Sequence, residues 1–284
     1  MSVEALRPGN VAVITGGASG IGLAAARKFL ELGLKVCIAD RDQDRLMQAG
    51  AGLAAAQDCL VAPCDVARLD DLKKLEKTIR EHFGRIDVLM NNAGIQPGSR
   101  ILGPQSDWDK VIAVNLMGVI NGSRVFAERM IAQGTAGLIV NTGSKQGITT
   151  PPGDPAYNVA KAGVKVFTEA LQHELRSRKG CRISAHLLIP GFVFTALTAK
   201  GRSDKPADAW TPEQTVDFML DSLARGDFYI LCPDNEVTRA TDEKRIAWAA
   251  GDIIENRPPL SRWHPDYGGR FSAFLNNPSG DRNG

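Results

Sequence analysis

The stretch that decides the fold runs from position 11 to position 22 and reads VAVITGGASGIG. Its first five residues are mostly β-branched and apolar, which favours a buried strand. Glycines at 16, 20 and 22 allow a tight turn and a close approach of the backbone to a ligand. The helical run that follows would present unpaired N–H groups and the positive end of its dipole. The stretch therefore predicts a pyrophosphate-binding turn between a strand and a helix.

The same alternation of strand and helix continues along most of the chain. Runs typical of strands occupy 11–15, 35–39, 59–62, 86–91, 138–142, 182–189 and 228–231. Helical patterns occupy 20–32, 42–56, 68–83, 107–133, 155–178 and 212–225, with a further helix at 238–255. Such alternation indicates βαβ units. We predict a doubly wound, Rossmann-like α/β fold with a mostly parallel sheet of about seven strands and helices on both faces.

The last third of the chain is less regular. Residues 192–211 are interrupted by Gly, Pro and charged residues, which indicates a long loop or a broken helix that closes over a substrate as a lid. The tail from position 256 is rich in Pro, Gly and Asn and is expected to be irregular. We expect a single domain over 1–284, with a core over about 10–231 and a C-terminal extension over 232–284.

Composition argues against several classes of protein. A net charge of +2 gives no strong attraction to nucleic acid or to an anionic membrane. The five cysteines form no CxxC pair and accompany no histidine cluster, so neither a disulfide framework nor a metal site is expected. Residues 1–10 lack the apolar core of a signal peptide, and the longest uncharged runs fall short of a membrane span. We expect a cytoplasmic protein that acts on a small molecule.

Asp40 bears on the identity of the nucleotide. It closes the second predicted strand, where an acid can accept hydrogen bonds from the ribose hydroxyls of adenosine. The same carboxylate would repel a 2′-phosphate, which favours NAD over NADP. Arg41 keeps NADP open, because an adjacent guanidinium can accommodate that phosphate.

Further segments, in this order, resemble the short-chain dehydrogenase/reductase family in its common short form, although the C-terminal extension departs from that form. They are TGGASGIG at 15–22, Asp65-Val66, NNAG at 91–94, Asn115, Ser144, YNVAK at 157–161 and Pro190-Gly191. The glycine spacing GxxxGxG is similar to this family and differs from that of the longer sugar-nucleotide epimerases. Ser19 stands where NADP-using relatives often carry a basic residue, which is a second indication of NAD.

The resemblance implies a catalytic set of Asn115, Ser144, Tyr157 and Lys161, with Tyr157 as general acid and base. Tyr157 and Lys161 are four residues apart, so both project from one helix face. Because a nearby ammonium favours the phenolate, we expect the pKa of Tyr157 to lie below its ordinary value of ~10. Ser144 would hold the substrate oxygen beside the Tyr157 proton. Asn115 would hold a water that links Lys161 to solvent; the alternative is a buried amide satisfied within the protein.

The resemblance also implies two sets of binding residues. Cofactor candidates are Gly16, Ser19, Gly20, Ile21, Gly22, Asp40, Arg41, Asp65, Val66, Asn91, Asn92, Ala93, Gly94, Tyr157, Lys161, Pro190, Gly191, Val193 and Thr195. Substrate candidates are Gln96, Lys145, Gln146, Ile148, Pro151, Pro152, Phe192, Phe194 and Leu197, each of which fits loop packing equally well. The second set is largely apolar, which favours a secondary alcohol or ketone with an apolar portion.

These observations predict an oxidoreductase that transfers a hydride between NAD(H) and a secondary alcohol or ketone without a metal. One alternative is an NADPH-dependent carbonyl reductase. Another is a non-catalytic nucleotide-binding regulator, which is disfavoured because all four residues of the catalytic set are intact. The helices at 107–133 and 155–178 carry apolar residues on more than one face, so a homodimer or homotetramer is expected.

Overall fold

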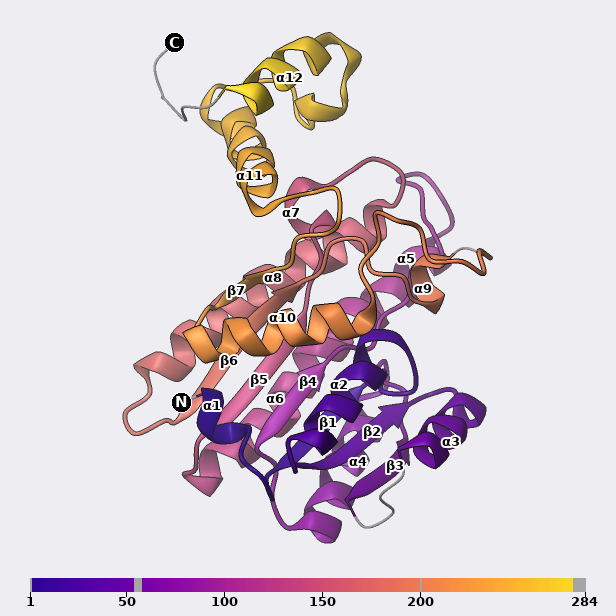
Figure 1. The fold of residues 1–284 in the computed structure, drawn as a ribbon, viewed down its shortest axis with the longest axis vertical. Helices are drawn as coiled ribbons and strands as arrows, with labels where there is room; N and C mark the ends of the chain where they lie inside the picture. Colours follow the sequence, from indigo (N-terminus) through magenta and orange to yellow (C-terminus); the bar gives the residue numbers. More distant parts are fainter. Residues whose placement is uncertain (1, 54–57, 200, 278–284) are drawn as a thin grey trace.

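In the computed structural model, which describes residues 2–53, 58–199 and 201–277, a sheet of seven parallel strands forms the centre of the molecule (Figure 1). The strands are β1 (Val11–Thr15), β2 (Lys35–Asp40), β3 (Cys59–Pro63), β4 (Val88–Asn91), β5 (Gly137–Thr142), β6 (Ile183–Ile189) and β7 (Tyr229–Leu231). Their order across the sheet is β3-β2-β1-β4-β5-β6-β7. The predicted doubly wound sheet is therefore confirmed. The order reverses between β1 and β4, and open α/β sheets bind ligands at this point, beyond the carboxyl ends of the strands.

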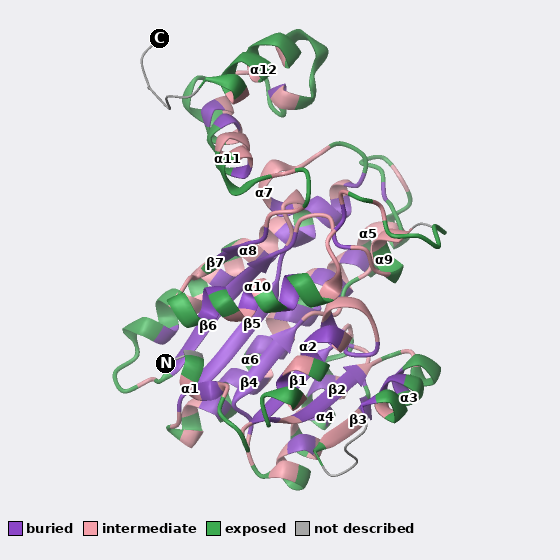
Figure 2. Ribbon diagram, in the orientation of Figure 1, coloured by how far each residue is buried: buried purple, intermediate pink, exposed green. Residues whose placement is uncertain are grey.

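Helices cover both faces of the sheet. One face carries α2 (Gly20–Glu31), α3 (Gln43–Gly52) and α10 (Pro212–Arg225). The other carries α4 (Leu69–Phe83), α6 (Gly118–Gln133) and α8 (Pro155–Ser177). Alternate side chains of β1 supply both layers, because Ala12 and Ile14 pack with the first group of helices and Val11 and Val13 with the second. Figure 2 shows the inner strands buried, the edge strand β3 mostly half-buried, and the outer sides of the helices exposed.

The predicted helix at 107–133 is present but not uniform. It divides into α5 (Gln105–Ile112), a π-helical turn η1 (Ala113–Met117) and α6. Asn115 lies in the π-helical turn. Such turns are rare and often occur at functional sites, and the apolar pattern of the sequence does not reveal this one.

The loop predicted at 192–211 is confirmed, with a single-turn helix α9 (Ala196–Ala199) inside it. Its two ends are joined by a bridge between Val193 and Trp210. Position 200 and positions 54–56 of the predicted helix at 42–56 lie outside the described residues. The described part of the chain contains no helix that is long and apolar enough to span a bilayer. The five cysteines, all within the described ranges, are free thiols.

The C-terminal extension contains more structure than its composition suggests. The helix expected at 238–255 is confirmed as α11 (Arg239–Ile254). The expectation of an irregular tail is wrong, because η2 (Ser261–Trp263), η3 (Pro265–Tyr267) and α12 (Gly268–Asn276) follow. The rings of Phe271 and Phe274 pack on Trp248, each at 5.3 Å between centroids, and so order the tail. In Figure 1 the C-terminal extension, drawn in gold and yellow, stands beyond the end of the sheet. Its helix α11 lies near α7 (Gln146–Thr149), and α12 lies further out.

Candidate active site

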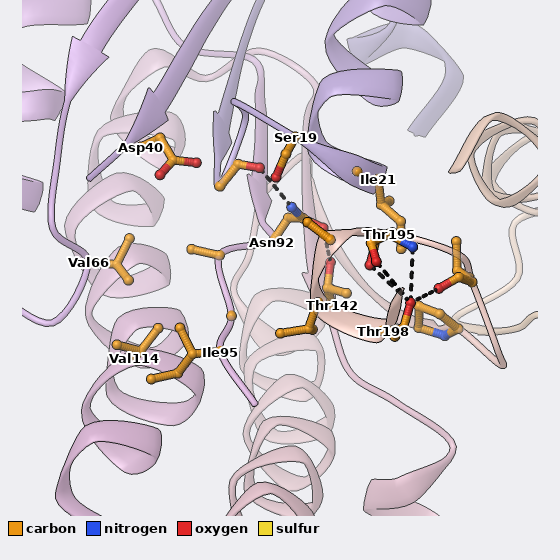
Figure 3. A pocket seen from close by; sticks show the side chains of 18 of the residues that line it. Ser19, Ile21, Asp40, Val66, Asn92, Ile95, Val114, Thr142, Thr195 and Thr198 are labelled. Carbon is orange, nitrogen blue, oxygen red and sulfur yellow. Dashed lines mark hydrogen bonds between the residues drawn. The ribbon is translucent and has the colours of Figure 1, made fainter. Parts of the chain in front are cut away.

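A cavity of about 500 Å³ lies at the carboxyl ends of the central strands. It joins the glycine turn to the helix that carries Tyr157, and it contains most of the predicted site residues. Those that line it are Gly16, Ser19, Gly20, Ile21, Asp40, Arg41, Asp65, Val66, Asn92, Ala93, Gly94, Ser144, Tyr157, Lys161, Pro190, Gly191, Val193 and Thr195. Figure 3 shows Asp40 and Val66 on one side of this cavity, Thr195 and Thr198 on the other, and Asn92 between them.

The turn after β1 fits closely against the segment that follows β4. Gly16 adopts a φ of +65°, and a Cβ there would lie only 2.7 Å from the Cα of Ala93. A side chain at Gly16 would therefore separate the two segments that meet at the switch point. Gly22 was predicted to bind the cofactor but does not line the cavity. It packs beneath the turn, where a Cβ would collide with the carbonyl oxygen of Gly16.

Asp40 is held firmly at the end of β2. Its Oδ1 accepts a hydrogen bond from the backbone N–H of Asp42 at 3.1 Å, and its Oδ2 accepts one from the N–H of Ala18 at 3.4 Å. The carboxylate is thereby fixed at one end of the cavity. Arg41, Asp42 and Arg45, which follow closely in the sequence, also line the cavity, so both acidic and basic groups surround the place where an adenosine ribose would lie.

Two adjacent asparagines have different roles. The side-chain amide of Asn92 donates to the carbonyl of Gly16 at 3.3 Å and accepts from the Thr142 hydroxyl at 3.4 Å, so it joins the ends of β1, β4 and β5. Asn91, also predicted to bind the cofactor, points the other way. Its Nδ2 donates to Ser123 at 3.0 Å and to Asn141 at 2.8 Å inside the protein. Because successive strand residues face opposite sides, only one of the pair can face the cavity.

Tyr157 and Ser144 meet inside the cavity. Burial raises the pKa of Tyr157 to about 12, the hydrogen bond from the Ser144 hydroxyl opposes this rise, and the charge of Asp154 adds to it. The expected lowering of this pKa is therefore wrong for the protein groups alone, because the loss of hydration outweighs the favourable contact. The Ser144 oxygen also accepts the backbone N–H of Gln146 at 3.1 Å, which fixes the hydroxyl at the start of α7.

Lys161 lies one helical turn beyond Tyr157 and is only 4% exposed. Its Nζ donates to the carbonyl of Thr142 at 2.7 Å and lies 5.7 Å from the centre of the Tyr157 ring. Burial lowers the pKa of Lys161 to about 8. The Lys161 side chain can therefore exchange a proton with its surroundings near pH 8.

Asn115 lies behind the cavity wall and is completely buried. Its Oδ1 accepts from the N–H of Ile95 and its Nδ2 donates to the carbonyl of Ile95, both at 2.8 Å. Each polar atom of the side chain thus has a partner within the protein, and the water-holding role stays a prediction. A Cβ at Gly94 would lie 3.5 Å from Asn115 Oδ1 and 3.9 Å from Lys161 Nζ, so Asn115 and Lys161 face the same glycine.

The predicted substrate residues are mostly elsewhere. Of that set, only Leu197 lines the described cavity. Ile148 packs into a core cluster with Val119 and Val164, and the ring of Phe192 lies under the Arg202 guanidinium. Gln96 and Gln146 are half-buried outside the cavity. In Phe194, the backbone N–H donates to the Trp210 carbonyl at 2.9 Å. The side chain of Lys145 contacts acidic residues of the extension.

Pro151 and Pro152 line a second cavity of about 560 Å³. Ile101, Val159 and Leu260 give this cavity a largely apolar wall. Asn158 also lines it, whereas its neighbour Tyr157 faces the first cavity. The two cavities therefore lie on adjacent faces of the first turns of α8.

Sequence reasoning missed several residues that line the first cavity. They are Asp42, Arg45, Cys64, Ile95, Val114, Thr142, Gly143, Ala196 and Thr198. Thr142 and Gly143 could have been found, because Thr142 ends β5 and Gly143 joins it to Ser144. Thr198 could not, because its place depends on the fold of the loop after β6, where its hydroxyl donates to the Val193 carbonyl. Among the described residues, no cluster of His, Cys, Asp or Glu could hold a metal ion.

Comparison with known proteins identifies the class. The profile of the short chain dehydrogenase family matches residues 10–206. A 3-oxoacyl-acyl-carrier-protein reductase of Thermotoga maritima is 38% identical over 196 residues, which cover 68% of this chain and 77% of that protein. Human 15-hydroxyprostaglandin dehydrogenase, whose name specifies NAD⁺, is 35% identical over 196 residues, which cover 66% of this chain and 70% of that protein. A crystal structure of a short-chain dehydrogenase/reductase from Burkholderia phymatum in complex with NAD matches with a TM-score of 0.80 and 32% sequence identity. The match covers 89% of this chain and 96% of that one.

This chain belongs to the short-chain dehydrogenase/reductase family, whose members are oxidoreductases that bind a nicotinamide cofactor. Its cavity has the features that such a cofactor needs. A strand–glycine turn–helix unit stands at the switch point, a fixed carboxylate lies at one end, and Tyr157, Ser144 and Lys161 lie at the other.

Proposed function

We propose that this protein is an NAD-dependent dehydrogenase that interconverts a secondary alcohol and a ketone. One observation carries the proposal: Tyr157, Ser144 and Lys161 line the same continuous cavity as the glycine turn and Asp40. Hydride and proton transfer need both groups of residues within reach of one bound pair of reactants.

The chain's own residues divide the work. The bound nicotinamide would accept or supply the hydride. Ser144 holds the substrate oxygen beside the Tyr157 hydroxyl, with which it already shares a hydrogen bond. Tyr157 transfers the proton to or from that oxygen. Since burial keeps Tyr157 protonated, the protein groups alone favour proton donation to a ketone. In the direction of oxidation, the nearby Lys161 cation favours the phenolate that must form.

NAD is the proposed nucleotide because Asp40 is fixed where a 2′-phosphate would lie close to its negative charge. The names of two similar proteins, the human dehydrogenase and the Burkholderia phymatum structure, also include NAD. Arg41 and Arg45 at the same end of the cavity support the alternative, an NADPH-dependent carbonyl reductase.

The proposed substrate is a small alcohol or ketone with an apolar portion. Ile95, Val114, Val193 and Leu197 line the cavity that contains Tyr157, and they would favour such a portion. The second, apolar cavity beside α8 offers further room of the same kind.

The proposal includes a homodimer or homotetramer. Val159 and Val166 of α8 are 49% and 62% exposed, and an apolar helix face of this kind favours contact with a second copy. A monomeric mass by light scattering at micromolar concentration would contradict this part of the proposal.

The test follows the absorbance of reduced cofactor while NAD or NADP is offered with a panel of secondary alcohols. Tyr157→Phe should lower turnover by about a thousandfold, because it removes the proton-transferring hydroxyl. Tyr229→Phe is the matched control, since that hydroxyl donates to Glu169 on the protein surface. Turnover with NADP alone would favour the alternative. Equal activity in the Tyr157→Phe enzyme and the wild type would refute the mechanism, and failure to bind either nucleotide would refute the function.

A further inference from the structure

Lys145 follows Ser144 directly, but its side chain points away from the cavity toward the C-terminal extension. Its Nζ lies 2.6 Å from Asp242 Oδ2 and 3.4 Å from Asp234 Oδ2. Asp242 lies in α11, near its start, and Asp234 lies between β7 and α11. The extension therefore supplies both carboxylates to the residue next to the proposed catalytic serine.

This cluster is buried. The side chains of Lys145, Asp234 and Asp242 are 15%, 9% and 5% exposed. A buried cation and its carboxylates constrain each other, because removing one partner leaves an uncompensated charge out of water. The position of α11 and the position of residue 145 are thus coupled.

The cluster also contacts the backbone that forms the cavity wall. Asp234 Oδ2 accepts the N–H of Phe192 at 3.4 Å, and the N–H of Lys145 donates to the Pro190 carbonyl at 3.2 Å. A Cβ on Gly191 would lie 2.6 Å from Asp234 Oδ2 and 3.0 Å from Lys145 Nζ. Gly191 therefore has the cofactor cavity on one side and this charged cluster on the other.

A second contact holds α7, the helix that follows Lys145. The indole Nε1 of Trp263, in η2, donates to the carbonyl of Thr149 at 3.2 Å. The first turn after Ser144 is therefore held by the extension through Lys145 at its start and Thr149 at its end. Ser144 itself depends on this turn, because its oxygen accepts the N–H of Gln146.

We propose that Asp242 is a positioning residue, which acts through Lys145 to hold the segment at 144–149 so that the Ser144 hydroxyl stays beside Tyr157. The C-terminal extension is then part of the active-site support. This inference rests on the proposed function for the role of Ser144, but the mechanical link between α11 and residue 145 does not.

The test compares three variants of the full-length protein. Asp242→Asn removes the charge at nearly constant shape, and Asp242→Glu keeps the charge. Glu243→Gln is the matched control, because Glu243 lies next to Asp242 on the same helix and its ion pair with Arg239 lies on the surface. Each variant is measured for kcat, for affinity for NADH by fluorescence titration, and for amide hydrogen exchange over positions 143–150.

For Asp242→Asn we expect kcat to fall by about tenfold, because a small displacement of a reacting group has a large effect on rate. Affinity for NADH should stay within about twofold, since the glycine turn and Asp40 are untouched. Exchange over 143–150 should become faster. Asp242→Glu should recover most of the loss, and Glu243→Gln should behave as wild type in kcat and in this exchange.

Two results would overturn the proposal. One is unchanged exchange over 143–150 in Asp242→Asn. The other is an equal loss of kcat in Glu243→Gln, which would show that the loss does not depend on the ion pair between Asp242 and Lys145. If the wild-type protein turns over no alcohol or ketone, the proposed function fails, and hydrogen exchange alone then decides whether Asp242 holds the segment.

Discussion

Phe126 in α6 and Trp248 in α11 are both large, buried aromatic residues, yet their surroundings differ. Phe126 is fully buried in a layer shared by β strands and the helices α4, α6 and α8. Trp248 packs on two rings of its own segment, lies under the Arg257 guanidinium at 4.2 Å, and donates to Ser261 at 2.8 Å. A layer shared by many elements unfolds with the whole molecule, whereas a small cluster can open by itself. We therefore expect the sheet to unfold together with the whole molecule and the extension to open by itself, although both aromatic residues are buried.

The largest expected effect tests this difference directly. Phe126→Ala should lower the global free energy of unfolding by about 4 kcal/mol, because it leaves a cavity in the shared layer. Trp248→Ala should change the same quantity by less than about 1 kcal/mol, since it releases only the extension. Urea denaturation followed by far-ultraviolet circular dichroism measures both.

Hydrogen exchange separates local from global opening in the same proteins. In Trp248→Ala, amides of α11 should exchange faster while those of β1 and β4 keep their wild-type protection. If Trp248→Ala instead lowered protection in the strands as much as Phe126→Ala does, the extension would be an integral part of the core and the comparison would fail.

A second prediction concerns the charged group buried in the sheet region. Burial lowers the pKa of Lys161 from 10.5 to about 8, so the folded protein binds this proton less tightly than the unfolded chain does. The charged lysine therefore costs about 3 kcal/mol of stability at neutral pH. This penalty is complete below pH 8 and is relieved as the pH rises from 8 toward 10.5.

Lys161→Met removes the titration. The free energy of unfolding of this variant minus that of wild type should therefore fall by roughly 2 kcal/mol between pH 7 and pH 10. Urea denaturation at several pH values measures this difference. Tyr157, whose raised pKa reduces stability only above pH 10, is present in both proteins and cancels in the difference. Parallel stability curves for the two proteins would show that Lys161 is not desolvated as the structure indicates.

The sequence predicts those parts of the fold that depend on local patterns of neighbouring residues. Val11–Thr15 and the glycine turn predict a strand, a ligand-binding turn and a helix because each step depends on neighbouring residues. The periodicity of later strands extends this to the whole sheet. Asp40 could be placed at the cavity from sequence because it ends a strand, whereas Ser144 and Lys161 were placed there by the family resemblance.

The features that the sequence does not predict depend on contacts between residues far apart in the chain. Lys145 was expected at the substrate, but it pairs with Asp242, 97 positions further along the chain. The tail was expected to be irregular, but the packing of Phe271 and Phe274 on Trp248 and the hydrogen bonds of Lys244 to the carbonyls of Leu275 and Asn277 order it. The raised pKa of Tyr157 also reflects burial, which no local spacing reports. Side-chain contacts of this kind have no periodic signature.

The smallest expected effect separates the two regions through cofactor choice. If Asp40 excludes a 2′-phosphate, Asp40→Ala should shift the ratio of kcat/KM for NAD over NADP by about tenfold toward NADP. Asp44→Ala removes the same charge from an exposed position in α3 and should leave the ratio unchanged. Asp242→Asn should also leave it unchanged, because the extension acts on the serine and not on the ribose. In the double variant Asp40→Ala/Asp242→Asn, the two effects should therefore multiply, as expected for independent sites. A change of selectivity in Asp242→Asn alone would show that the extension also shapes the nucleotide end of the cavity, and the two regions would then no longer be separable in function.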